Sequence, residues 1–150
     1  MNMYQVNTMF DPQAARAVIA RIEAIKPTAQ KQWGEMNVAQ MLAHCSAANE
    51  MASGFVKRPR RFIGRILGPF FKKVLTNNAP YGQGNPTDPA FVMKDEKDFE
   101  SEKKKLLGLV KGFAQRGAAG ASKHSHPFFG KISQEEWGVA QWKHLDHHLR

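Results

Sequence analysis

The apolar residues recur at intervals of three and four along much of the chain, which is the spacing of amphipathic helices. The first such segment starts at Asp11-Pro12, an N-cap followed by a proline in the first turn, and Pro27 ends it. Between these residues lie the apolar positions Ala15, Val18, Ile19, Ile22 and Ile25. We therefore predict the first helix of the fold here.

Two further helices are predicted from capping boxes, in which the N-cap and the third helical residue satisfy each other's backbone groups. Asn37 and Gln40 open the first of these helices, and Gly54 closes it. Its apolar stripe is Val38, Met41, Leu42 and Cys45. Ser133 and Glu136 open the other, which is the last helix of the chain and carries Trp137, Ala140, Gln141, His144 and His148.

A fourth helix begins at Asp95 or Asp98 and stops at Gly117, with an apolar stripe of Phe99, Leu106, Leu107, Val110 and Phe113. No good alternating run of β-branched residues indicates a strand. The connection around 27–36 is short and favours antiparallel neighbours, whereas the span 54–95 is long. We predict an all-α fold, a four-helix bundle with a long crossover between helices two and three.

Composition fits a packed globule, with 42% apolar residues, three Trp and ten Phe in 150 residues. This length suits one domain covering 1–150. The single cysteine, Cys45, excludes an intrachain disulfide and fits a reducing compartment. No apolar stretch approaches the roughly 20 residues that span a bilayer, and the N-terminus lacks the pattern of a secretion signal. We expect a cytoplasmic protein.

The formal net charge of +9 is concentrated in one part of the crossover, 57–75. Apolar residues there keep helical spacing, and Gly68-Pro69 should kink or break the helix. We favour a short crossover helix packed across the bundle, where it would cap a candidate metal pocket between histidines of the second and last helices. A helix lying on an acidic membrane surface is the second interpretation, and nucleic-acid binding, without any recognition motif, is the third. The basic residues are Lys57, Arg58, Arg60, Arg61, Arg65, Lys72 and Lys73.

Three histidines form the candidate site. His144 and His148 are four residues apart and therefore share one face of the last helix, and His44 lies in another predicted helix. Ala47 and Ala48 leave a hollow of small residues beside His44. Three neutral imidazoles with an open fourth position can hold a reactive metal ion. The alternative is that these histidines lie on solvated helix faces.

Other polar residues close to the three histidines in the sequence, or of the same type, have different expected roles. His147 points about 60° away from the other two on its helix, and Cys45 is rotated off the face of His44 and suits the core. Asp146 fits either an acceptor behind an imidazole or the solvated face. Gln141, one turn before His144, is the candidate contact for substrate or water. Caps within a loop are the expected role of His124 and His126.

Two stretches carry a resemblance to a known family. The run Trp33-Gly34-Glu35-Met36-Asn37-Val38-Ala39-Gln40-Met41-Leu42-Ala43-His44 and the ending His144-x-x-His147-His148 resemble segments of the DinB-like metal-binding superfamily. The ending 126–150, with its His126-Pro127-Phe128-Phe129-Gly130 run and Glu136-Trp137-Gly138, resembles an uncharacterised branch. Leu149-Arg150 replaces the Gly-Gln pair that more commonly follows the paired histidines.

The resemblance implies a four-helix bundle in up-down-down-up order and a divalent metal, zinc or nickel, held by His44, His144 and His148. Relatives in that superfamily include thiol transferases that use low-molecular-weight thiols and an isomerase of a maleyl–thiol adduct.

We therefore expect a metal-dependent enzyme with thiol S-transferase-like or hydrolase-like activity on a small-molecule substrate, which a low-molecular-weight thiol would suit. The competing expectation is a non-enzymatic basic helical bundle that binds acidic membrane surfaces through 57–75. Neither requires specific nucleic-acid binding, and a homodimer is compatible with both. Because metal ligation needs neutral imidazoles, binding should weaken as the pH falls through about 6.5.

Overall fold

The computed structural model describes residues 7–30, 36–76 and 91–149, and the side chains of these residues apart from 70–76. Within these ranges the chain is helical, and the only β pairing is an isolated bridge between His126 and Gly130. The all-α prediction is therefore confirmed. In chain order the elements are α1 (Pro12–Ala24), α2 (Val38–Ala52), α3 (Phe62–Thr76), α4 (Phe99–Arg116), the 3-10 turn η2 (Ala118–Gly120) and α5 (Gln134–His148).

The helix ends lie where the capping residues place them. Asp11 caps α1 by accepting a hydrogen bond from the amide of Ala14, and Asp98 caps α4 in the same way. Both predicted capping boxes are present, at the start of α2 and at the start of α5. Gly54 and Gly117 follow α2 and α4 with φ of 77° and 65°, which only glycine adopts without strain.

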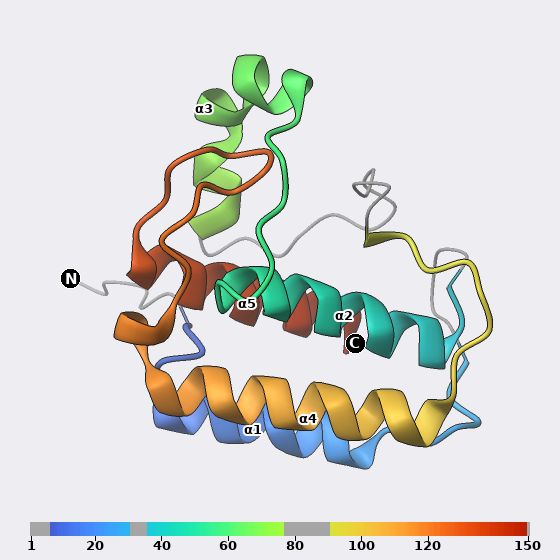
Figure 1. The fold of residues 1–150 in the computed structure, drawn as a ribbon. Coiled ribbons are helices and arrows are strands. Elements are labelled where there is room, and N and C mark those ends of the chain that lie inside the picture. The colour runs from blue at the N-terminus through green and yellow to red at the C-terminus, as the bar shows by residue number, and fades with distance from the viewer. Residues whose placement is uncertain (1–6, 31–35, 77–90, 150) are drawn as a thin grey trace.

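Four of the helices form a bundle (Figure 1). α1 and α5 run in one direction and α2 and α4 in the other, so the chain order is up-down-down-up, as the resemblance implied. Going around the bundle, each helix contacts the next in the order α1, α4, α2, α5. The residues 31–35, which hold the first part of the DinB-like motif around Trp33, lie outside the described chain.

The prediction that the first two helices are neighbours is wrong. α1 and α2 are antiparallel but occupy opposite corners of the bundle, without mutual contact in the described residues. The connection 25–37 has ample reach for this, because an extended chain covers about 3.3 Å per residue. The preference of a short loop for adjacent helices does not hold at this length.

α2 is the most buried helix of the bundle. Every residue from Leu42 to Asn49 is buried, including His44 at 3% exposure. Small side chains make this possible because they let α4 and α5 approach closely from two sides. They are Ala43, Ser46, Ala47 and Ala48.

α3 stands apart from the bundle (Figure 1), and it contacts α5 alone among the described helices. The favoured interpretation, an apolar stripe packed across the bundle over the metal pocket, is wrong for the described side chains. Phe62 is 79% exposed, and Ile63, Ile66 and Leu67 are exposed as well. The helix instead packs through Gly64 and Gly68, where the backbone of Phe128 lies so close that a larger side chain would clash with it. It is also unbroken at Gly68-Pro69, where a kink or break was expected, with Pro69 inside it.

Among the described residues, no helix has the length and apolar character needed to cross a membrane.

Candidate metal centre

The structure brings His44 of α2 together with His144 and His148 of α5. The Nε2 atom of His44 lies 2.9 Å from Nε2 of His144 and 3.1 Å from Nε2 of His148. All three ligand atoms fall within 4.8 Å of one another. Two helices that run antiparallel at adjacent corners of the bundle thus supply one cluster from positions a hundred residues apart.

A backbone carbonyl fixes the proton on the first imidazole. Nδ1 of His44 lies 2.7 Å from the carbonyl oxygen of Phe91, which can only accept a hydrogen bond. Nδ1 therefore donates, and in the neutral ring the lone pair is on Nε2, the nitrogen that faces the other two histidines. Metal-binding histidines in proteins are oriented in the same way, by a carbonyl or carboxylate behind the ring.

The electrostatics of the cluster favour neutral rings. Burial lowers the pKa of His44, although its hydrogen bond to Phe91 works in the opposite direction, and the nearby His147 lowers it further. Burial also lowers the pKa of His148 to about 3, and neighbouring imidazoles add to the effect. The pKa of His144 is held well below its usual range by burial first and by His44 and His148 next. Neutral imidazoles are the state that a metal ion needs.

The donor set fits a divalent metal ion. Three imidazole nitrogens at tetrahedral positions around zinc, each about 2.0–2.1 Å from the ion, lie about 3.3 Å apart. The two distances from His44 Nε2 are slightly shorter than this. Three nitrogen ligands leave a further coordination position open, which is typical of catalytic sites. The buried Nδ1 of His144 has no hydrogen-bond partner within the described chain.

Gln141 lies beside the cluster but within the protein. It is 3% exposed, its Oε1 accepts a hydrogen bond from Nδ2 of Asn49, and its Nε2 donates to the carbonyl of Ala48. The side chain thus joins α5 to α2 one turn from His144. Its predicted contact with substrate or water stays a prediction.

The remaining polar candidates lie outside the cluster. His147 is buried with its ring 4.9 Å from that of His148, and it is not part of the ligand group. Cys45 is fully buried, and burial raises the pKa of its thiol to about 12, so it is protonated at neutral pH. Asp146 forms an ion pair with Arg21 of α1 at 2.9 Å.

The two loop histidines, His124 and His126, are not part of the ligand group. Nδ1 of His126 accepts hydrogen bonds from the amides of Phe128 and Phe129, which confirms its expected role as a cap within the loop. His124 is exposed, and its backbone amide donates to Ser122.

Sequence reasoning missed three residues around the centre. The Phe91 carbonyl comes from a connection without helical pattern, so no side-chain signal could have revealed it. Asn49 could have been noticed as a polar residue that continues the apolar stripe of Leu42 and Cys45 at helical spacing. Lys143 is only 4% exposed, and burial lowers its pKa to about 8. Its position beside His144 was visible in the sequence, but its burial was not.

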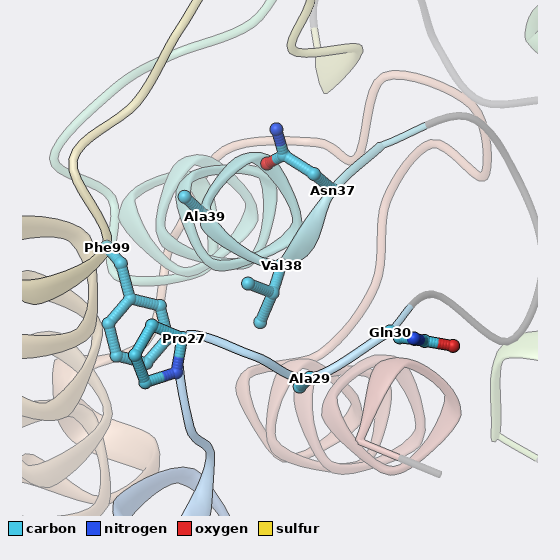
Figure 2. Close-up of a pocket in the computed structure, with 7 residues that line it drawn as sticks. All are labelled: Pro27, Ala29, Gln30, Asn37, Val38, Ala39 and Phe99. Carbon is cyan, nitrogen blue, oxygen red and sulfur yellow. The ribbon is translucent and has the colours of Figure 1, made fainter.

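A separate hollow of about 610 Å³ lies between the start of α2 and the start of α4 (Figure 2). None of the three histidines lines it. The lining residues are Pro27, Ala29, Gln30, Asn37, Val38, Ala39 and Phe99. This hollow therefore belongs to the end of the bundle and is not part of the histidine cluster.

Fold and site together define a helical bundle with a largely buried three-histidine centre that could hold a metal ion. The chain belongs to the family described as "Protein of unknown function (DUF1569)", which matches residues 7–150. No curated protein and no solved structure matches it.

Proposed function

We propose that this chain is a divalent-metal-dependent enzyme whose metal is held by His44, His144 and His148. The observation that carries the proposal is the convergence of the three Nε2 atoms, with His44 Nε2 at 2.9 and 3.1 Å from the others. Three unprotonated nitrogens at such distances repel one another unless a cation or a shared proton lies between them. Their lowered pKa values favour the neutral rings that a metal ion requires, and three such rings with converging Nε2 atoms suit a bound cation.

The chain itself would orient and protect this centre. The Phe91 carbonyl holds the His44 ring in the tautomer that presents Nε2. The Gln141–Asn49 hydrogen bond fixes α5 against α2 one turn from His144. Burial of His44 limits water around the ligands. A divalent ion bound there supplies Lewis-acid chemistry and lowers the pKa of a water or thiol that it binds.

The reaction class that we propose is transfer of a small-molecule thiol, with hydrolysis as the alternative chemistry of the same centre. The resemblance of the sequence segments 33–44 and 144–148 to the DinB-like metal-binding superfamily supports thiol chemistry, and zinc or nickel as the metal. The up-down-down-up helix order is compatible with that superfamily. The ligand set alone fits both reactions.

Metal analysis of the purified protein tests the first step. Protein prepared without added metal should contain a stoichiometric divalent ion, and His144→Ala and His148→Ala should lose it. His124→Ala is the matched control, because it removes an exposed histidine from the same chain without touching the cluster. Equal metal content in His144→Ala and His124→Ala would remove His144 from the site.

A spectroscopic titration separates the two reactions. In protein loaded with cobalt(II), binding of a low-molecular-weight thiol should add a strong near-ultraviolet thiolate charge-transfer band. A spectrum that stays unchanged with thiol, together with hydrolysis of a test ester that needs the metal, would favour the hydrolase and reject thiol transfer.

A further inference from the structure

α3 is attached to the rest of the protein by one side only. Cβ atoms added at Gly64 and Gly68 would lie 2.6 and 2.2 Å from the carbonyl oxygen of Phe128, so both glycines are in direct contact with that backbone. The amide of Arg61 donates to the carbonyl of Pro127, and the guanidinium of Arg60 donates to the carbonyl of His126. The turn 126–130 therefore holds the first half of α3 firmly in place.

The opposite side of α3 is apolar and faces solvent. A helix turns about 100° per residue, which sets Phe62 and Ile66 roughly opposite the two glycines, with Ile63 and Leu67 continuing the same apolar surface toward one flank. We call these four residues the outer face. They are 79, 59, 54 and 37% exposed. Single exposed apolar residues are normal, but a contiguous group of large ones on one ordered helix marks an interaction surface.

The charged residues nearest to the outer face along the chain are all basic. Arg65 and Lys57 are exposed, and Arg58, Arg60 and Arg61 are half-buried nearby in the sequence. The sequence has no acidic residue between Glu50 and Asp88. A partner that covers this surface must therefore accept large apolar side chains and carry negative charge.

We propose that α3 docks on an anionic phospholipid bilayer, with its outer face inserted among the lipids and its basic residues at the headgroups. Apolar residues on one helix face beside lysines and arginines suit the interface of such a membrane. Each basic residue near an anionic surface strengthens binding about fivefold, and buried apolar area adds to this.

The same observations weigh against other occupants. A symmetric dimer through α3 would bring two identical basic surfaces together, and like charges that face each other destabilise such an interface. Nucleic acid would satisfy the charge but leaves large apolar side chains without a partner, and no recognition motif accompanies them. Only a surface that is both anionic and apolar satisfies both features.

Vesicle co-sedimentation of the full chain tests the proposal. The protein should sediment with vesicles of phosphatidylglycerol and phosphatidylcholine and stay in solution with phosphatidylcholine alone. Raising NaCl from about 0.1 M to about 1 M shortens the Debye length from about 10 to about 3 Å and should release it. Absence of sedimentation with the anionic vesicles at low salt overturns the proposal.

Matched variants locate the binding surface. Arg65→Glu should weaken partitioning roughly tenfold or more. Lys104→Glu changes the net charge by the same amount as Arg65→Glu, but it alters an exposed residue of α4, a helix that α3 does not contact. This control variant should bind the vesicles nearly as well as wild type. Ile66→Ser should weaken binding roughly fivefold, whereas Ile66→Leu should retain it. Circular dichroism melting confirms that the variants are folded.

Two outcomes would contradict this assignment. Equal losses in Arg65→Glu and Lys104→Glu would show that overall charge, and not α3, governs binding. A dimer in sedimentation velocity without lipid that Ile66→Ser dissociates would assign the outer face to a second copy of the chain. Metal content has no part in either readout, so failure here leaves the proposed metal centre untouched.

Discussion

α2 and α3 are both 15 residues long, yet they relate pattern to burial in opposite ways. α3 has the cleaner apolar stripe, and the described part of that stripe is exposed. α2 mixes apolar, small and polar residues, and its positions from Leu42 to Asn49 are all buried. The difference shows that the buried side of a helix is the side to which another backbone can approach most closely, and not always the side with the largest apolar residues.

In α2 that approach creates the site. Alanines and Ser46 let α5 lie close enough for His144 and His148 to reach His44. In α3 the small residues are Gly64 and Gly68, and they receive the turn 126–130. The same principle that buries a histidine in one helix therefore leaves a face of large apolar residues exposed in the other.

The comparison predicts a large difference between two leucines. Leu42→Ala in α2 should lower the free energy of unfolding by about 2–5 kcal/mol, because it empties a fully buried position. Leu67→Ala in α3 should lower it by less than about 1 kcal/mol, since that side chain is already 37% exposed. Urea unfolding followed by circular dichroism measures both. Similar losses would mean that α3 is packed as tightly as α2.

His44, His144 and His148 should make stability depend on pH when the metal has been removed with a chelator. Their pKa values are lowered in the folded protein, to about 3 for His148, whereas a histidine of the unfolded chain has a pKa of about 6.5. Below about pH 6.5 the unfolded chain therefore binds more protons than the folded protein does. Stability is therefore fully present above about pH 6.5 and is lost as the pH falls toward the folded pKa values. Each ring contributes up to about 1.4 kcal/mol per pH unit in this window.

Unfolding curves between about pH 7.5 and about pH 5.5 check this prediction. His144→Ala should show a shallower slope than wild type, and His124→Ala, an exposed histidine in a loop, should retain the wild-type slope. A wild-type slope in His144→Ala would contradict the assignment of the lowered pKa to the cluster.

Two glycine-to-alanine changes test the docking of α3. Gly68→Ala places a Cβ 2.2 Å from the Phe128 carbonyl oxygen and should cost about 1–3 kcal/mol of docking free energy. Gly108→Ala in α4 meets nothing within 4 Å and should stabilise the protein by about 0.5–1 kcal/mol through helix propensity. Hydrogen exchange of α3 amides should accelerate in the first variant alone. Unchanged hydrogen exchange of the α3 amides in Gly68→Ala would show that the turn 126–130 shifts to accommodate the added Cβ.

The smallest effect is expected at the Arg21–Asp146 ion pair, which joins α1 to α5 on the partly exposed side of the bundle. Asp146→Asn should lower the free energy of unfolding by at most about 1 kcal/mol. A double-mutant cycle with Arg21→Gln measures the coupling. Metal affinity should be unchanged, and a tenfold loss would instead support the interpretation of Asp146 as an acceptor behind an imidazole.

The helices of the bundle were predictable because their ends are encoded locally. Asn37 with Gln40 and Ser133 with Glu136 form the expected capping boxes, and Asp98 and Gly117 bound α4. The clustering of the three histidines also followed from helical spacing and the resemblance. These features depend on residues a few positions apart, where geometry leaves few alternatives.

The diagonal placement of α1 and α2 and the exposure of α3 could not be predicted in this way. Both depend on which backbones meet across the fold, as Gly64 meets Phe128. The partner of His44 was equally hidden, because a carbonyl such as that of Phe91 is present at every residue and carries no sequence signal.

The attachment of α3 has a consequence for how this protein can diverge. The turn touches the glycines through backbone atoms of Phe128, so the fit depends little on which large residues occupy the far side of the helix. Substitutions can therefore change that side from apolar to polar, or from basic to acidic, without affecting the bundle and its three clustered imidazoles. Substituting either glycine would instead demand a new shape for the turn.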